Sequence, residues 1–386
     1  MKPTTEIIHR AEGVCHEAET LTTPIYASTT FVFDTAEQVR QYNLGASPRF
    51  LYSRYGNPTV ASVQEKIAVL EGTDAALLLS SGQAATTTAL LALLSAGDEI
   101  VCSSAIYGGT LHLLADVLPK FGITTRFVTL DELAHPGRLF SQATKIVWFE
   151  SPINPTLRCV DIAEVASACR ARRVLSVVDN TFASPINQQP IALGVDLVMH
   201  SVTKYINGHS DITAGALAGS AALIDQIWKT QKMLGTVLDP AAAYAVGRGL
   251  KTIAVRVDRH NANALAIARW LEKDARVMAV YYPGLERHPD HAIATRQMRG
   301  FGGMVCVDVG GGYARAARFF DRLQVFKRAA SLGGVESLCS LPVLTSQWGL
   351  SAEELERAGV TDSMARLSVG LEDVEDLIAD LDQALG

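Results

Sequence analysis

From about residue 60 to residue 225 the sequence alternates between short apolar runs and amphipathic segments of helical length. Such alternation is typical of strands in a parallel sheet, because each crossover helix covers a face of the sheet and leaves the strands buried on both sides. The predicted strands are 75–79, 99–102, 124–128, 145–149, 174–178 and 196–200, and the predicted helices are 60–71, 84–94, 110–121, 162–172 and 221–234. We therefore predict an α/β fold with a mainly parallel central sheet and helices on both faces.

A chain of 386 residues with 48% hydrophobic content can bury more than one core. The pattern predicts three parts: an N-terminal arm over 1–45 that is poor in regular periodicity, an α/β domain over 46–250, and a smaller α+β domain over 251–386. A long helical pattern over 252–272 joins the last two parts. The smaller domain has predicted strands near 277–281, 303–309 and 366–369 and a final helix over 371–385.

Charge and residue usage exclude several classes of function. The net charge is −6 without a basic run, so there is no electrostatic footprint for nucleic acid or an anionic membrane. Residues 1–10 lack the apolar stretch of a secretory signal, and no apolar run approaches the length of a membrane span, so we expect a cytoplasmic protein. No metal site is expected from the spacing of His9, His112, His200, His209 and His260. Free, mostly packed thiols are expected for Cys15, Cys102, Cys159, Cys169, Cys306 and Cys339, which form no C-x-x-C pair.

The segment 201–205, with sequence SVTKY, directly follows the predicted strand 196–200. It places Lys204 between small hydroxyl side chains. An amine that is fixed beside a cofactor aldehyde can form a Schiff base and later carry protons. Ser201 and Thr203 would then be ligands of a phosphate. A lone lysine in a polar loop is usually solvated, but these neighbours favour the catalytic interpretation.

Two further strand ends carry matching chemistry. The strand 174–178 ends at Asp179, whose carboxylate suits a pyridine nitrogen, although Asp at this position is also a common helix N-cap. The strand 75–79 runs through Gly82 and Gln83 into a helix, where backbone N–H groups and the helix dipole favour an anion. Such junctions are common in α/β proteins. Ligands bind beyond the carboxyl ends of the strands in open α/β sheets, so the three sites are expected to meet.

The chain as a whole resembles the pyridoxal-phosphate-dependent enzymes of cysteine and methionine metabolism, the transsulfuration or cystathionine gamma-synthase-like family. The resemblance covers nearly the full length and rests on segments that occur in order. They are 24–31 (PIYASTTF), 52–59 (YSRYGNPT), 80–82 (SSG), 107–110 (YGGT), 150–156 (ESPINPT), 179–181 (DNT), the lysine segment, 331–334 (SLGG) and 366–373 (RLSVGLED). It implies the fold type I of these enzymes, with pyridoxal 5′-phosphate as the cofactor and 46–250 as the domain that binds it.

The resemblance also implies roles for individual residues. Lys204 would carry the cofactor and move protons, and Tyr107 would stack on the cofactor ring and assist the leaving group, although an aromatic residue at a strand end is ordinarily core material. The implied cofactor contacts are Tyr52, Arg54, Gly82, Gln83, Tyr107, Asp179, Ser201, Thr203 and Lys204. Tyr52 and Arg54 would reach the phosphate of a neighbouring subunit, toward which the arm also extends. This implies a homodimeric catalytic unit and, by family precedent, a homotetramer.

The substrate would be a small amino acid. By resemblance its carboxylate is held by Arg366, assisted by Asn154 and by the backbone of Ser331 and Leu332. If the segment 366–370 did not resemble the family, Arg366 would be interpreted as a strand-edge arginine in an ordinary salt bridge. Glu372 and Asp373 are expected to form a solvated first turn of the final helix.

The implied activity is γ-replacement or γ-elimination on an O-acyl-homoserine or a sulfur amino acid, as in a sulfhydrylase or a cystathionine gamma-synthase. Family members that handle cystathionine commonly carry an acidic residue where this chain has Leu51, and the gamma-lyases carry another where it has Ala330. Methionine gamma-lyases usually carry Cys at the position of Gly109. These departures weaken the alternatives of a cystathionine gamma- or beta-lyase and of a methionine gamma-lyase. An aminotransferase is another alternative, because it would share the cofactor, the lysine and the arginine. A non-catalytic homologue would not be expected to keep Lys204, Asp179, Tyr107 and Arg366 together.

Overall fold

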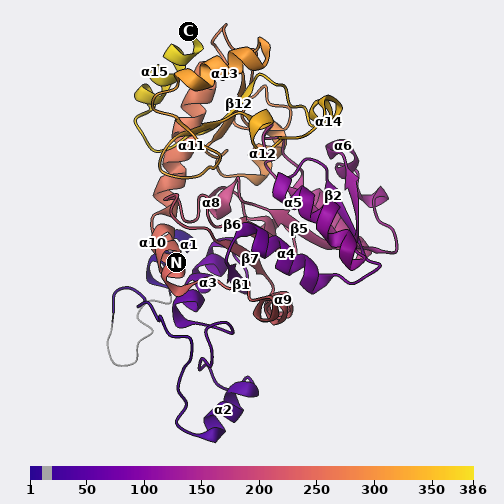
Figure 1. Cartoon of the computed structure of the whole chain (residues 1–386), viewed down its shortest axis with the longest axis vertical. Helices are drawn as coiled ribbons and strands as arrows, with labels where there is room; N and C mark the ends of the chain where they lie inside the picture. The colour runs from indigo at the N-terminus through magenta and orange to yellow at the C-terminus, as the bar shows by residue number, and fades with distance from the viewer. Residues whose placement is uncertain (11–19) are drawn as a thin grey trace.

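The computed structural model describes residues 1–10 and 20–386, which form two sheets with their covering helices (Figure 1). The larger sheet has the strand order β1-β7-β6-β5-β4-β2-β3. Its strands are β1 Ala75–Leu79, β2 Glu99–Ser103, β3 Thr124–Val128, β4 Thr144–Glu150, β5 Leu175–Asp179, β6 Leu197–Ser201 and β7 Gly215–Gly219. All neighbouring strands from β6 to β3 pair in parallel, and β7 pairs antiparallel with both β1 and β6.

Alternate residues of each strand pack into cores on opposite faces, as a sheet covered on both sides requires. Ile146 and Trp148 of β4 face the core under α4, α9 and the turns after α5, whereas Val147 and Phe149 face the core under α7. In β1, Leu77 faces the first of these cores. Helices cover both faces of the sheet because the strands offer apolar side chains in both directions.

The helices begin and end at residues with recognisable capping chemistry. Asn57, Ser81, Asp161, Ser220 and Asp239 cap the helices α3, α4, α7, α9 and α10 through their side chains. The helices are α1 Pro3–His9, α2 Ala36–Asn43, α3 Pro58–Glu71, α4 Gly82–Leu93, α5 Gly108–His112, α6 Leu130–Leu133, α7 Ile162–Arg172, α8 Ser184–Asn187, α9 Ala221–Leu234, α10 Pro240–Leu250, α11 Ile253–Leu271, α12 His291–Gln297, α13 Gly312–Arg322, α14 Ala352–Arg357 and α15 Val374–Leu385.

The smaller sheet has the order β10-β11-β12-β9-β8. Its strands are β8 Ala279–Tyr281, β9 Met304–Asp308, β10 Lys327–Arg328, β11 Leu338–Ser340 and β12 Met364–Ser368. Helix α11 extends along one side of the molecule from the level of α10 to the smaller sheet (Figure 1). Its start contributes Ile253 and Val257 to the core around α3 and α10, and its end contributes Ile267 and Leu271 to the core of the smaller sheet.

The predicted fold class is confirmed, and several elements differ from the prediction. The helix predicted over 110–121 is α5 followed by a π-helical turn, Leu113–Val117, and a 3₁₀ turn, Leu118–Phe121, because Pro119 cannot donate the backbone bond that would continue the helix. The arm is not devoid of helices, since α1 and α2 lie within residues 1–45. Strands β7, β10 and β11 and helices α6, α8, α10, α12, α13 and α14 were not predicted.

The final helix begins later than predicted. Helix α15 starts at Val374 with Asp373 at its N-cap, so residues 371–373 precede the helix. The carboxylate of Glu372 accepts hydrogen bonds from the backbone N–H and the hydroxyl of Ser337 (2.7 and 2.8 Å). The expectation that Glu372 belongs to a solvated first turn was therefore wrong, because a tertiary hydrogen bond uses its carboxylate.

Other expectations can be compared for the described residues. Cys102, Cys159, Cys169, Cys306 and Cys339 are free and buried, and Cys15 lies outside the described residues. Within residues 1–10 and 20–386 no group of His, Cys, Asp and Glu is arranged to hold a metal ion. In the same ranges no helix is both long and apolar enough to cross a bilayer.

Candidate active site

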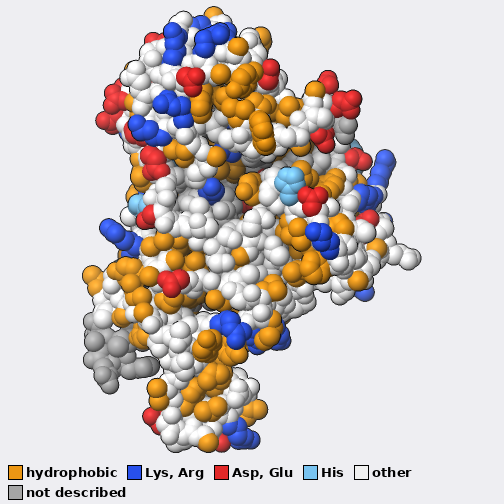
Figure 2. Space-filling view, viewed as in Figure 1, with side chains coloured by type: hydrophobic (Ala, Val, Ile, Leu, Met, Phe, Trp, Pro, Cys, Tyr) orange, Lys and Arg blue, Asp and Glu red, His pale blue; other side chains and the backbone are white. Residues whose placement is uncertain are grey.

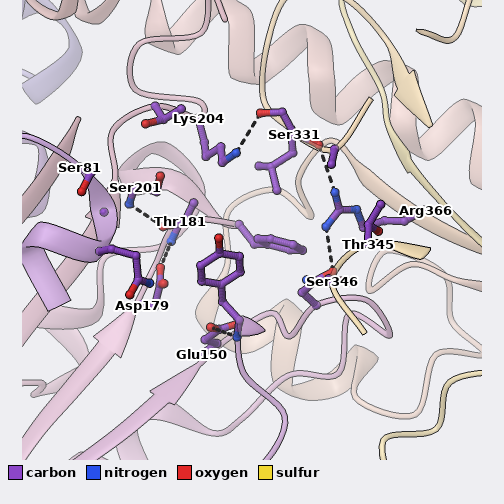
Figure 3. Close-up of a pocket in the computed structure, with 18 of the residues that line it drawn as sticks. Ser81, Glu150, Asp179, Thr181, Ser201, Lys204, Ser331, Thr345, Ser346 and Arg366 are labelled. Carbon is purple, nitrogen blue, oxygen red and sulfur yellow. Dashed lines mark hydrogen bonds between the residues drawn. The ribbon is translucent and has the colours of Figure 1, made fainter. Parts of the chain in front are cut away.

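A cavity of about 680 Å³ lies where the carboxyl ends of the larger sheet meet the smaller sheet. Its walls come from the ends of β4, β5 and β6, from the start of α4, and from residues 330–332, 344–346 and 366. Figure 3 shows Lys204, Ser331 and Arg366 along one side of this space, with Asp179 and Thr181 across from Lys204. Residues that are distant in the sequence meet at this cavity because the two sheets lie on either side of it.

The start of α4 offers hydrogen-bond donors at one end of the cavity. The hydroxyl of Ser81 caps the backbone N–H of Ala84, while the N–H groups of Gly82 and Gln83 belong to the first turn, which has no intrahelical acceptor. A side chain at Gly82 would meet Cβ of Ser201 at 3.1 Å, so glycine allows α4 to approach the end of β6. The hydroxyl of Thr203 also lines the cavity, and it donates to the carbonyl of Ala214 at 3.2 Å. These groups form a donor set suited to a phosphate.

The carboxylate of Asp179 lies at the end of β5 and lines the same cavity. One of its oxygens accepts a hydrogen bond from the backbone N–H of Thr181 at 3.0 Å. The pKa of Asp179 is raised above its usual value by burial, and the hydrogen bonds from Thr181 and the nearby imidazole of His200 oppose this rise. Asp179 is not the N-cap of a helix, because the next helix, α8, begins at Ser184 with Ala183 at its N-cap. Its carboxylate instead accepts a bond from the following turn and faces the cavity.

The amine of Lys204 donates a hydrogen bond to the hydroxyl of Ser331 at 2.8 Å. Burial, and next the positive charge of Arg366, lower the pKa of Lys204 to about 8. Since the uncharged amine is the nucleophile, this environment brings Lys204 close to its reactive form at neutral pH.

The guanidinium of Arg366 is almost completely buried on β12 and reaches the cavity from the smaller sheet. It donates to the side-chain oxygen of Asn154 at 3.0 Å and to the backbone carbonyl of Ser331 at 3.2 Å. Its Nε has no partner among the described residues, although it is buried. A buried arginine that is bonded only to neutral groups leaves its charge available for an anionic ligand.

Tyr107 lies at the mouth of the cavity with 49% of its surface exposed. Its backbone N–H donates to the carboxyl group of Glu150 at 2.6 Å. A side chain at Gly109 would come within 2.5 Å of the Tyr107 ring, so glycine at this position permits the observed orientation of the ring.

Tyr52 and Arg54 lie apart from this cavity in the same chain. Arg54 donates to the backbone carbonyl of Lys232, and its guanidinium stacks over the rings of Tyr52 and Tyr55. A single chain therefore brings together the predicted residues Gly82, Gln83, Tyr107, Asn154, Asp179, Ser201, Thr203, Lys204, Ser331, Leu332 and Arg366, but not Tyr52 and Arg54.

Several residues of the cavity were not predicted from the sequence. Glu150, Thr181, Thr345 and Ser346 all line it. Glu150 and Thr181 belong to segments that carried the resemblance, so their position at strand ends could have suggested them. Thr345 and Ser346 follow a 3₁₀ turn of the smaller domain, Pro342–Leu344, and no sequence pattern marks them.

A family model described as Cys/Met metabolism PLP-dependent enzyme matches residues 4–386. The chain is 41% identical over 383 residues to cystathionine gamma-synthase 1, chloroplastic, of Nicotiana tabacum, with 98% of this chain and 71% of that protein covered. It is 42% identical over 369 residues to an L-methionine gamma-lyase of Fusobacterium nucleatum subsp. polymorphum, with 95% and 93% covered. The solved structure of cystathionine gamma-lyase from Lactobacillus plantarum complexed with L-serine matches with a TM-score of 0.93 and 37% identity, over 100% of this chain and 98% of that one.

Proposed function

The chain belongs to the Cys/Met metabolism PLP-dependent enzyme family, and from this premise we propose that it replaces or eliminates the γ substituent of an O-acyl-homoserine or a related sulfur amino acid. The observation that carries the proposal is the convergence of the Lys204 amine, the Asp179 carboxylate and the Arg366 guanidinium on one cavity. These three groups suit a cofactor aldehyde, a pyridine nitrogen and a substrate carboxylate, respectively.

The donor set described above fits pyridoxal 5′-phosphate. In this proposal the N–H groups of Gly82 and Gln83 and the hydroxyls of Ser201 and Thr203 would hold the phosphate. Thr203 would have to release the carbonyl of Ala214 to donate to it. Asp179 would hold the pyridine nitrogen, and Tyr107 would cover the ring. When bound, the cofactor supplies an electron-accepting ring that makes the bonds at the substrate α carbon easier to break.

Lys204 is the proposed proton carrier of the reaction. Its uncharged amine takes the proton from the α carbon of the substrate, and a second proton transfer at the β carbon prepares loss of the group on the γ carbon. The hydroxyl of Ser331 holds Nζ of Lys204 on the side of the cavity where Arg366 lies. The phenol of Tyr107 is placed at the cavity mouth, where it can give a proton to a leaving group.

Arg366 is the proposed anchor of the substrate carboxylate. Asn154 and the carbonyl of Ser331 fix two of its nitrogens, so the planar guanidinium has one orientation before substrate arrives. A carboxylate bound there places the α carbon toward Lys204, because Ser331 contacts both residues.

The lining of the cavity supports a substrate without a distal positive charge. Among the described lining residues the acidic ones are Glu150 and Asp179, both at strand ends on the cofactor side. Ala330 contributes no carboxylate to the opposite wall, so the distal ammonium of cystathionine would lack a charge-assisted partner there. An acylated homoserine needs no such partner.

A lyase is the second candidate, because the relatives include an L-methionine gamma-lyase at the same level of identity as the synthase. The decisive experiment supplies purified protein with the cofactor, O-acyl-L-homoserine and sulfide, and identifies products by mass spectrometry. Homocysteine as the main product supports a sulfhydrylase. Exclusive formation of 2-oxobutanoate and ammonia means that water is the acceptor and overturns the replacement reaction in favour of a lyase. Lys204→Ala serves as the control that removes the proton carrier.

The proposal extends to assembly. We place a cofactor-binding domain at 46–250, a C-terminal domain at 251–386, and an arm at 1–45 that reaches a second copy of the chain. In Figure 2 hydrophobic side chains gather on the segment that projects around α2, where Val32 is 87% and Leu44 is 65% exposed. A dimer that covers this segment would bring the partner's Tyr52 and Arg54 to the phosphate, and two dimers would form a tetramer. We place the enzyme in the cytoplasm.

A further inference from the structure

Glu150 is a second carboxyl group beside Asp179. The two residues pair in register at the ends of the neighbouring parallel strands β4 and β5, so their side chains leave the same face of the sheet. Both line the cavity, and Glu150 is only 4% exposed. Adjacent paired residues in a parallel sheet lie about 5 Å apart. Two acidic side chains that leave neighbouring strands at this backbone spacing repel each other when both are charged, and shielding from water strengthens the repulsion.

The surroundings treat the two carboxyl groups differently. Asp179 accepts the hydrogen bond from Thr181 and lies near the imidazole of His200 on β6, which pairs closely with the buried carboxylate of Glu71. Both the bond and the imidazole favour the charged form of Asp179.

Glu150 has weaker support for a charge. Among the described residues, the N–H of Tyr107 donates a hydrogen bond to Glu150, and no side chain is recorded as a donor to it. The buried thiol of Cys102 on β2 lies close enough for the charge of Glu150 to raise its pKa, and it offers Glu150 no positive charge. Burial, and next the charge of Asp179, raise the pKa of Glu150 well above its usual range.

We propose that Glu150 is a positioning residue that is held as a neutral carboxylic acid, so that Asp179 carries the single negative charge at this end of the cavity. The inference rests on the proposed function, in which Asp179 holds the pyridine nitrogen. Glu150 acts through two neighbours: it leaves the charge to Asp179, and one of its oxygens holds the backbone at Tyr107 where α5 begins. A glutamine would perform both tasks, because its amide is neutral and its oxygen accepts the same bond.

The first test uses the protein without cofactor and does not depend on the role of Asp179. A protonated carboxyl group has an infrared C=O band that is separate from the bands of carboxylates. At neutral pH the difference spectrum between the wild-type protein and Glu150→Gln is expected to show the loss of one such band. A difference spectrum that instead loses only carboxylate intensity would overturn the proposal.

The second test measures the dissociation constant of pyridoxal 5′-phosphate and the absorbance of the bound cofactor as a function of pH. Glu150→Gln is expected to stay within about threefold of the wild type, and Glu150→Ala to bind about tenfold more weakly, because the N–H of Tyr107 loses its acceptor. Asp179→Asn, the matched charge-removing control, is expected to bind at least about tenfold more weakly.

The outcomes separate the inference from the proposed function. Loss of cofactor affinity in Glu150→Gln equal to that in Asp179→Asn would mean that the charge of Glu150 is needed, and would overturn the inference. Normal binding by Asp179→Asn together with loss of the infrared band in Glu150→Gln would leave Glu150 neutral and refute the role proposed for Asp179. Thermal unfolding of each protein without cofactor identifies any variant that has simply failed to fold.

Discussion

At the scale of single residues, burial determines the reactivity of Lys204. Water stabilises an ammonium group, so removing water and placing Arg366 nearby lower the pKa of Lys204 to about 8. We expect competitive acetylation of the cofactor-free protein, followed by mass spectrometry, to give half-maximal reactivity of Lys204 near pH 8. A free lysine side chain, with a pKa of about 10.4, serves as the reference. A midpoint equal to the reference would contradict this environment.

Glu150 leads to a prediction about stability. Its pKa is raised in the folded protein from an ordinary value of 4.5, so above that pH the folded state holds a proton that the unfolded state has lost. The contribution of Glu150 to stability is therefore present at low pH and falls as pH rises, by at most about 1.4 kcal/mol per pH unit. In Glu150→Gln the decline between pH 5 and pH 8 is expected to be shallower, measured by denaturant unfolding of the cofactor-free protein. Parallel curves for the two proteins would contradict the prediction.

Arg366 leads to a prediction about substrate binding. Arg366→Lys keeps the charge but loses the planar fork that can bond a carboxylate twice. We expect the KM for the amino-acid substrate to rise about tenfold to a hundredfold, with a smaller change in kcat, because binding of the carboxylate is lost in ground state and transition state alike. The matched control is Arg158→Lys, since Arg158 also bonds a carboxylate twice, that of Asp290, away from the cavity. Equal effects of the two changes on KM would argue against the role of Arg366.

At the scale of elements, the approach of β7 to α4 shapes the donor set for the phosphate. A Cβ atom at Gly215 would lie 2.1 Å from the backbone oxygen of Ser81, so a side chain would push the start of α4 away. We expect Gly215→Ala to destabilise the protein by about 1–3 kcal/mol and to weaken cofactor binding. Gly137→Ala is the control, because a Cβ atom there meets nothing within 4 Å. Unchanged cofactor affinity in Gly215→Ala would show that α4 does not depend on this contact.

At the scale of the whole molecule, the position of Arg54 outside the cavity of its own chain is the basis for a test of shared sites. Arg54→Ala and Lys204→Ala each remove one component of a site. If Arg54 serves the partner subunit, a mixed dimer of the two variants contains one intact site. Coexpression of both variants is then expected to restore about one quarter of the wild-type activity for random pairing in a two-fold dimer. No recovery in verified mixed dimers would mean that Arg54 does not serve the neighbouring site.

Local patterns in the sequence were sufficient for much of the fold. The strands β1 and β3 and the helices α7 and α9 were predicted with their observed bounds. Strand β7 escaped prediction because its sequence, GALAG, has small side chains and glycines that are poor signals for a strand. It forms because its neighbours β1 and β6 supply hydrogen-bonding partners on both sides.

The sequence by itself determined the kinds of chemical groups present and their places at strand ends, because apolar periodicity and turn residues are local properties of a chain. Only the tertiary structure decided which groups meet. Arg366 and Asn154 are bonded although 212 residues separate them, and the contact requires the two sheets to close over a common cavity. Likewise, Glu150 lies beside Asp179 because β4 pairs with β5 in a particular register. Pairing and closure depend on the packing of the whole chain, and so do the solvent exclusion and the charges that set the pKa values of Lys204 and Glu150.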